Sequence, residues 1–175
     1  MRTHLCFLFV VCESWRIFDL SIAMAYAMLT VYGKQNQSLS AAAAMLRGYN
    51  AVCPLTKEER QHLLLLIACR LSCSVTLGAY SYKQNPGNEY LLLHATPAWN
   101  ALELIWGTDV ERRASMRKAI DGLFDLACSK SGVLVEGQPI DCSDLAFPDP
   151  SVNDPFAAVR TKSDSSPEAK RPRTD

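Results

Sequence analysis

The chain has 175 residues, enough for one domain, and 49% of them are hydrophobic, which is ordinary for a globular protein. Its 18 basic and 18 acidic residues give a formal net charge of zero. This balance gives no support to a nucleic-acid-binding surface, which needs clustered Lys and Arg. The seven cysteines are odd in number and form no CxxC pair. They therefore indicate buried thiols in a reducing compartment rather than a zinc site or a disulfide framework.

The first segment, Met1 to Cys12, superficially resembles a secretory signal peptide, because a basic start precedes a short apolar run. No small-residue cleavage site follows before Glu13 and Trp15. We interpret residues 1–13 as a divergent leader, either a short buried strand or a segment of no structural consequence.

Two helices are expected next. The first spans Ser14 to Val31, with Asp19 in its first turn to complement the helix dipole and Gly33 after its end. Its apolar residues recur every three or four positions on one face: Ile17, Leu20, Met24, Met28 and Val31. The second is expected to begin with Ser38 as its cap, to contain an alanine-rich run, and to stop before Pro54.

The stretch from Thr56 to Tyr82 is predicted to be the central core helix. Thr56 and Glu59 have the spacing of a capping box, which marks a helix start. From Leu63 to Ala79, apolar or small residues occur on every side, as in a helix buried within a bundle. Arg60, His62 and Arg70 keep the continuous apolar run far shorter than the roughly twenty residues that a membrane span needs.

Three further helices are expected after a turn at Pro86 and Gly87. A short one runs from Glu89 to His94, another opens with Thr96 and Pro97, and the last opens with a Thr108–Glu111 capping box and runs to about Ser129. The sequence therefore predicts an all-α fold, an array of five to six helices over residues 14–130.

From Gly137 onward, proline, serine and charged residues dominate, so residues 131–175 are expected to form a disordered tail. The basic cluster from Lys170 to Arg173 has two interpretations, a solvated tail or a nuclear address.

Candidate catalytic residues are not found. The phosphate-binding patterns GxxxxGK[ST] and GxGxxG are absent, and His4, His62 and His94 lie outside HExxH-type or triad-like contexts. No catalytic or metal-binding residue is therefore assigned.

Arg70 is the one charge deep in the core helix, and a buried guanidinium must be paired. An ion pair with Asp19 or Glu89 is the structural hypothesis. A bidentate clamp for a substrate carboxylate is the functional alternative.

The segment from Ser14 to Trp99 resembles the C-terminal helical lobe of hydroxylysine kinase-like proteins, in the aminoglycoside phosphotransferase and choline kinase superfamily. The order and approximate spacing of several short fragments carry the resemblance over roughly 90 residues. These fragments are Ser14-Trp15-Arg16, Phe18-Asp19-Leu20, Ile22-Ala23-Met24-Ala25-Tyr26, Arg47-Gly48-Tyr49, Pro54-Leu55-Thr56, Arg70-Leu71, Ser74-Val75, Asn88-Glu89-Tyr90-Leu91 and Ala98-Trp99.

The resemblance implies the C-terminal lobe of a protein-kinase-like fold in a cytoplasmic small-molecule kinase. Such a kinase transfers the γ-phosphate of GTP, or of ATP, with Mg²⁺ to the hydroxyl of 5-hydroxy-L-lysine. It also implies an acceptor site lined by Arg70, Tyr80 and Trp99, and structural roles for Asp19 and Glu89. The family's phosphate-binding lysine, catalytic loop and metal-binding aspartate have no counterpart in this sequence, so we expect the chain alone to be inactive and to bind no nucleotide.

Two alternatives remain open. The chain is either a fragment of such a kinase or a non-catalytic helical module that self-associates or binds a partner protein through the apolar face of the lobe. A membrane-associated protein that uses Met1 to Cys12 and Ile17 to Val31 is the third interpretation, against which Arg16 and Asp19 argue.

Overall fold

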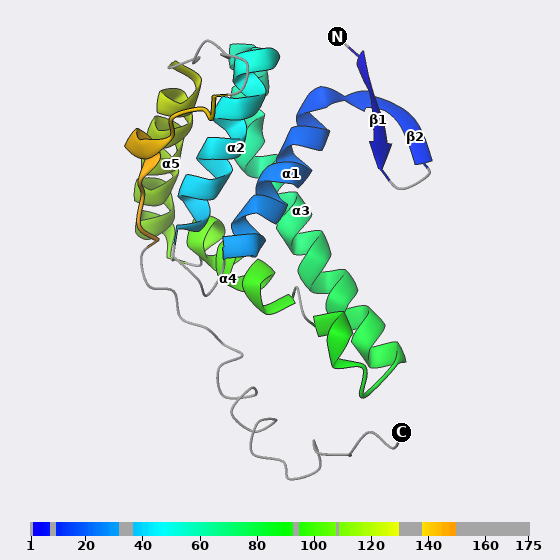
Figure 1. Ribbon diagram of the computed structural model, residues 1–175. Coiled ribbons are helices and arrows are strands. Elements are labelled where there is room, and N and C mark those ends of the chain that lie inside the picture. The colour runs from blue at the N-terminus through cyan, green and yellow to red at the C-terminus, as the bar shows by residue number, and fades with distance from the viewer. Residues whose placement is uncertain are drawn as a thin grey trace, which may run out of the picture.

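The computed structural model describes residues 2–7, 10–31, 37–92, 95–107, 109–129 and 138–149, with side chains from Trp15 onward except those of residues 89 and 91. Five α-helices make up the body: α1 (Arg16–Val31), α2 (Ser38–Val52), α3 (Lys57–Gln84), α4 (Ala95–Trp106) and α5 (Val110–Ser129). Short 3₁₀ helices lie at Glu89–Leu92 (η1) and Ser143–Leu145 (η2). The predicted helical array is confirmed (Figure 1). The predictions for Gly33, Thr108 and residues 150–175 lie outside the described residues.

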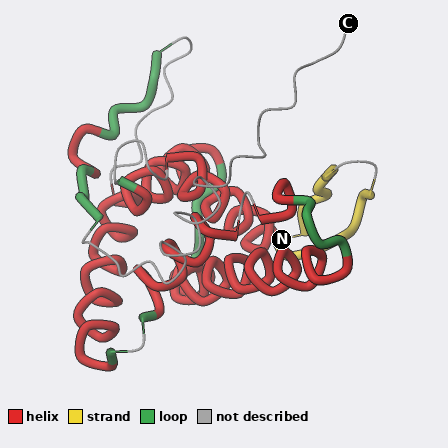
Figure 2. Tube along the Cα trace, turned by 90° about the horizontal axis from the view of Figure 1, so that it is seen from below, coloured by secondary structure: helices red, strands yellow, loops and turns green. Residues whose placement is uncertain are grey.

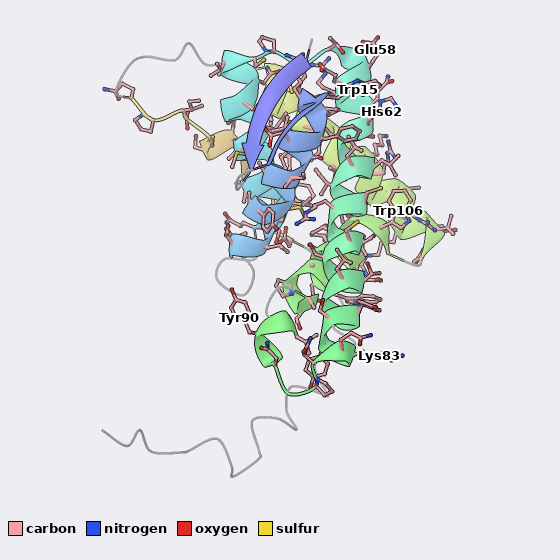
Figure 3. The ribbon with its side chains drawn as sticks, turned by 90° about the vertical axis from the view of Figure 1, so that its right-hand side faces the viewer. Trp15, Glu58, His62, Lys83, Tyr90 and Trp106 are labelled. Atoms are coloured by element: carbon pink, nitrogen blue, oxygen red, sulfur yellow. The ribbon has the colours of Figure 1, made fainter. Side chains whose placement is uncertain are left out.

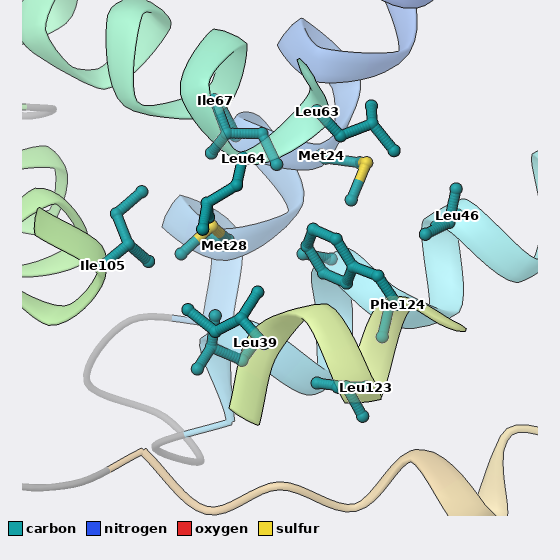
Figure 4. Close-up of a cluster of buried hydrophobic side chains, with 14 of the residues drawn as sticks. Met24, Met28, Leu39, Leu46, Leu63, Leu64, Ile67, Ile105, Leu123 and Phe124 are labelled. Carbon is teal, nitrogen blue, oxygen red and sulfur yellow. The ribbon is translucent and has the colours of Figure 1, made fainter. Parts of the chain in front are cut away.

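The helices pack in pairs around one hydrophobic core. Helix α1 contacts both α2 and α3, α3 contacts α4, and α2 contacts α5. The face predicted for α1 is confirmed, since Ile17, Leu20, Met24 and Met28 are buried. Figure 4 shows the centre of this core, where side chains from all five helices meet: Met24, Met28, Leu39, Leu46, Leu63, Leu64, Ile67, Ile105, Leu123 and Phe124.

A β-hairpin precedes the helical body. Strands β1 (Arg2–Phe7) and β2 (Val10–Trp15) pair antiparallel, with Arg2 opposite Trp15 and Phe7 opposite Val10. The hairpin leads directly into α1 and lies at one side of the helices (Figures 1 and 2). The leader therefore contains strand structure, as one interpretation of the sequence suggested, and the pairing of two strands is an addition to the all-α prediction.

Helix α3 begins as predicted. The Thr56 hydroxyl accepts a hydrogen bond from the Glu59 amide at 3.3 Å, and the Glu59 carboxylate accepts one from the Thr56 amide at 2.8 Å. These reciprocal bonds form the expected capping box.

The predicted burial of α3 on every side is wrong. Its buried residues all lie between Leu63 and Leu71, and the stretch from Ser72 to Gln84 contains none. Leu77 and Tyr80 are 61% and 63% exposed. Two features account for this. At 1.5 Å per residue α3 is about 42 Å long and α1 only about 24 Å, so α3 extends past this neighbour. Its side away from the core is also open, since Leu65 is 43% exposed even in the part that packs on the core. Helix α3 is also long and apolar enough to cross a membrane. This is weak evidence for a membrane span, because core helices of soluble proteins have the same length and hydropathy.

Three predicted helix starts differ in detail. The residue that precedes α2 is Gln37, which makes no side-chain cap, and Ser38 is the first helical residue instead of the cap. Helix α4 begins at Ala95, one residue before the predicted cap at Thr96. Helix α5 is capped by Asp109, whose carboxylate accepts bonds from the amides of Glu111 at 2.9 Å and Arg112 at 3.1 Å.

The prediction of a disordered tail is wrong for residues 138–149, which pack against α2 and α5 (Figure 1). We call this segment the strap. Leu145 is 1% exposed, and the hydroxyl of Ser40 bonds both to the Phe147 amide at 2.8 Å and to its carbonyl at 3.2 Å. The strap is ordered despite its polar composition for two reasons. Leu145 is buried in the core, and the carboxylates of Asp144 and Asp149 accept hydrogen bonds from groups of α2.

Candidate functional site

Arg16, the first residue of α1, is a buried arginine that joins three segments. Its Nε and Nη2 atoms donate to the two carboxylate oxygens of Glu59 at 2.7 and 2.6 Å. Its Nη1 atom donates to the Cys53 sulfur at 2.9 Å and Nη2 to the Pro54 carbonyl at 2.9 Å. The side chain is only 8% exposed, so this bidentate pair fixes the start of α1 against the α2–α3 junction. The hydrogen bonds from Arg16 hold the pKa of Glu59 below its usual value.

Arg47 of α2 is the second buried arginine, and it caps the end of α5. Its Nη2 atom donates to the Leu126 carbonyl at 3.1 Å and its Nε atom to the Ala127 carbonyl at 3.4 Å. One helical turn further along α2, the Asn50 amide donates to the Cys128 carbonyl at 3.3 Å. The last carbonyls of a helix have no hydrogen-bond partner within the helix and carry partial negative charge. A buried cation at this end donates hydrogen bonds to the carbonyls and compensates the charge.

The strap completes the environment of Arg47. Its Nη1 atom donates to the Asp141 carbonyl at 2.8 Å, and Nη1 and Nη2 both donate to the carboxylate of Asp144, the latter at 3.1 Å. These bonds raise the pKa of Arg47. Because Arg47 is 1% exposed and Asp144 a quarter exposed, the ion pair closes the outer side of an otherwise buried cation. One guanidinium therefore ties α2, α5 and the strap together.

Arg70 of α3 has a different partner from the one predicted. Its Nη2 atom donates to the Tyr26 hydroxyl at 2.6 Å, and the guanidinium carbon lies 5.2 Å from the centre of the Tyr26 ring. Its Nε atom is buried without a hydrogen-bond partner among the described residues.

The predicted ion pair of Arg70 with Asp19 is wrong within the described side chains. Asp19 and Tyr26 lie about 10 Å apart along α1, so a guanidinium over Tyr26 does not reach Asp19. Burial raises the pKa of Asp19, as expected for a carboxylate that lacks a compensating cation. The alternative pair with Glu89 lies outside the described side chains.

The three residues predicted to line an acceptor site do not converge. Tyr80 is 63% exposed and lies ten residues beyond Arg70 on α3, about 15 Å along the axis and on another side of the helix. Trp99 is partly buried on α4, which packs against α3. Their roles in substrate binding stay predictions.

The other predicted residues have simple environments. His62 is exposed, and its Nδ1 atom bonds to the Glu58 carbonyl at 2.7 Å; His94 and the side chain of His4 lie outside the described part. Cys53, Cys69, Cys73, Cys128 and Cys142 are free thiols. Among the described residues, three or more His, Cys, Asp or Glu side chains nowhere come together.

The sequence interpretation missed Arg16 and Arg47, although a signal was present. Arg47 and Asn50 continue the buried face of α2 at helical spacing, after Leu39, Ala43 and Leu46. A polar residue at a core position needs a buried partner. The fragments Ser14-Trp15-Arg16 and Arg47-Gly48-Tyr49, which carry the resemblance, contain these two arginines.

Comparison with known proteins agrees with that resemblance. The chain is 37% identical to the hydroxylysine kinase of Xenopus laevis over 90 residues, which cover 51% of this chain and 23% of the relative. It is 33% identical to the hydroxylysine kinase of Mus musculus over 91 residues and 34% identical to that of Danio rerio over 101 residues, 27% of that protein. The chain therefore spans about a quarter of the length of these curated relatives. No family model and no solved structure matches it. Over about half of its length, the chain is similar to proteins named hydroxylysine kinase.

Proposed function

We propose that this chain is the helical, acceptor-side part of a hydroxylysine kinase-type phosphotransferase. The identity of 33–37% over about half of the chain to proteins named hydroxylysine kinase carries this proposal. The complete enzyme would act in the cytoplasm and transfer the γ-phosphate of GTP, or of ATP, to the hydroxyl of 5-hydroxy-L-lysine.

The chain alone is proposed to be inactive. Phosphoryl transfer depends on groups that hold the nucleotide phosphates, the magnesium ions and the attacking hydroxyl in line. The sequence contains neither phosphate-loop pattern, and the family's phosphate-binding lysine, catalytic loop and metal-binding aspartate have no counterpart in it. What the residues do supply is a rigid support, since the networks of Arg16 and Arg47 fix α1, α2, α3 and α5 relative to one another.

Arg70 is the candidate contact to the acceptor. Its guanidinium rests on Tyr26 and has no carboxylate partner among the described residues, and its Nε atom is unpaired. A guanidinium binds a carboxylate through two parallel hydrogen bonds, and 5-hydroxylysine carries such a group. Tyr80 and Trp99 belong to the same proposal as further acceptor-side residues.

The test combines turnover with binding. The purified chain is incubated with GTP or ATP, Mg²⁺ and 5-hydroxy-L-lysine, with the Xenopus laevis relative as the positive control, and phosphohydroxylysine is measured by mass spectrometry. We expect no product from the chain alone, and turnover would refute its proposed inactivity.

Binding of 5-hydroxy-L-lysine is then followed by NMR for the chain, for Arg70→Met and for Arg117→Met. Arg117 is a matched control because it lies exposed on α5, where it pairs with the exposed Asp121 at 3.6 Å. Binding that Arg70→Met alone abolishes supports the acceptor site. Absence of binding by the unsubstituted chain contradicts it.

The second candidate function is a non-catalytic interaction module. It is favoured by the exposed apolar side chains on α3, among them Leu65, Leu77 and Tyr80. A chain that binds no hydroxylysine but forms a defined complex would favour this function over the first.

A further inference from the structure

The side of α3 that faces away from the core carries a continuous apolar stripe. We call it the outer face of α3. Apart from the adjacent pair Thr76 and Leu77, its members follow one another at intervals of three or four residues, which places them on one side of a helix. They are Glu58, His62, Leu65, Cys69, Cys73, Thr76, Leu77, Tyr80 and Lys83.

The middle of the outer face is apolar and open to solvent. Leu65, Leu77 and Tyr80 are 43%, 61% and 63% exposed, and Cys69 and Cys73 are exposed as well. From Leu65 to Tyr80 the stripe is about 22 Å long. Figure 3 looks onto this side of the molecule and shows α3 in front of the other helices.

Two hydroxyls within this stretch, those of Thr76 and Ser72, already have backbone partners. The Thr76 hydroxyl donates to the Ser72 carbonyl at 2.9 Å, and the Ser72 hydroxyl beside the stripe donates to the Ala68 carbonyl at 2.9 Å. The one charge between Leu63 and Tyr82 is Arg70, whose guanidinium turns away to Tyr26. A contact over this stretch therefore leaves the Thr76 and Ser72 hydroxyls paired and brings no carboxylate or ammonium group into the interface.

Opposite charges lie at the two ends of the outer face. Figure 3 shows Glu58 near the start of α3 and Lys83 near its end. At 1.5 Å per residue the two positions are about 37 Å apart along the helix. Two copies of α3 in antiparallel orientation would set Glu58 of each against Lys83 of the other. The same register sets Leu65 opposite Thr76 and Leu77, and Cys69 opposite Cys73. A parallel pair would instead oppose like charges.

We propose that the outer face of α3 binds a second copy of this chain, as an antiparallel, two-fold symmetric helix pair. The two-fold axis passes near the middle of the stripe, between Cys69 and Cys73. A two-fold interface needs one patch that complements itself, and the reversed order of charge along the outer face provides that property. This proposal does not depend on the kinase relationship.

The first experiment measures the mass of the full chain in solution across a range of concentrations by analytical ultracentrifugation. We expect a concentration-dependent dimer. Leu77→Glu is expected to raise the dimer dissociation constant at least about tenfold, because burial of one leucine side chain contributes that much or more. Val110→Glu is the matched control, since Val110 is 69% exposed but lies on α5. It is expected to leave the dimer unchanged.

The orientation is tested by charge reversal. Glu58→Lys and Lys83→Glu are each expected to weaken the dimer, and the double variant is expected to restore it, because only antiparallel chains regain opposite charges. Circular dichroism of each variant checks that the helices are intact.

Three results would overturn the proposal: a wild-type chain that is monomeric at every concentration, a dimer that Val110→Glu disrupts as strongly as Leu77→Glu, or a double variant that stays monomeric. A monomer that floats with neutral phosphatidylcholine vesicles would assign the outer face to lipid instead.

Discussion

Replacing Asp144 by alanine tests the central role of Arg47. The substitution removes the carboxylate that accepts from both Nη atoms of Arg47, while the guanidinium stays 1% exposed. Its bonds to the carbonyls of Leu126, Ala127 and Asp141 remain. The perturbation therefore isolates the loss of one anionic partner from a buried cation.

The expected cost follows from this geometry. Removing one partner of a fully buried ion pair costs about 3–5 kcal/mol. Asp144 is a quarter exposed, so water replaces part of the lost interaction, and we expect a loss of about 2–3 kcal/mol in the free energy of unfolding. Arg47→Met is expected to cost more, about 3–5 kcal/mol, because it also leaves the last carbonyls of α5 unpaired.

Urea unfolding followed by circular dichroism at the helical band measures both values. The exposed pair of Arg117 and Asp121 on α5 supplies the control, because its side chains are 44% and 54% exposed. Asp121→Ala should change the free energy of unfolding by less than about 1 kcal/mol. If Asp144→Ala were no more destabilising than Asp121→Ala, the strap would not stabilise the fold and the reasoning would be refuted.

Three further predictions concern other contacts of the helical body. Because the folded pKa of Glu59 is lowered by Arg16, its stabilisation is complete above its ordinary pKa of about 4.5 and is lost as the pH falls through the lowered value. The melting temperature of Glu59→Gln should therefore fall less steeply with decreasing pH than that of the wild type. Equal slopes of melting temperature against pH would contradict this. Asp149→Ala removes the carboxylate that accepts from the Ser38 amide at 2.7 Å, and it should lower the free energy of unfolding in urea by about 1 kcal/mol. Asp149→Asn should retain most of this stabilisation. Tyr26→Phe keeps the ring under Arg70 but removes the hydroxyl bond, and it should lower the free energy of unfolding by about 1 kcal/mol. If Tyr26→Phe lowered it as much as Tyr26→Ala, the hydroxyl bond and not the stacking of the guanidinium on the ring would dominate.

The sequence by itself determined where the helices lie and how α3 begins. Capping, helical periodicity and turn residues act within about four positions along the chain, so the Thr56–Glu59 box and the buried face of α1 were predictable. The same local patterns carried the resemblance to hydroxylysine kinases over about half of the chain. The apolar neighbours of Arg70 indicate that it needs a partner, but the sequence did not identify Tyr26 as that partner.

Only the tertiary structure decided which distant groups meet. The carboxylate of Asp149 caps α2 from 111 residues away, and Asp144 pairs with Arg47 across 97 residues. Nothing local distinguishes these carboxylates from others in a polar segment, so the composition of the strap predicts disorder although the segment packs on α2 and α5. Exposure of the second half of α3 was likewise decided by the lengths of its neighbours, because burial depends on what packs against a helix as well as on its own residues.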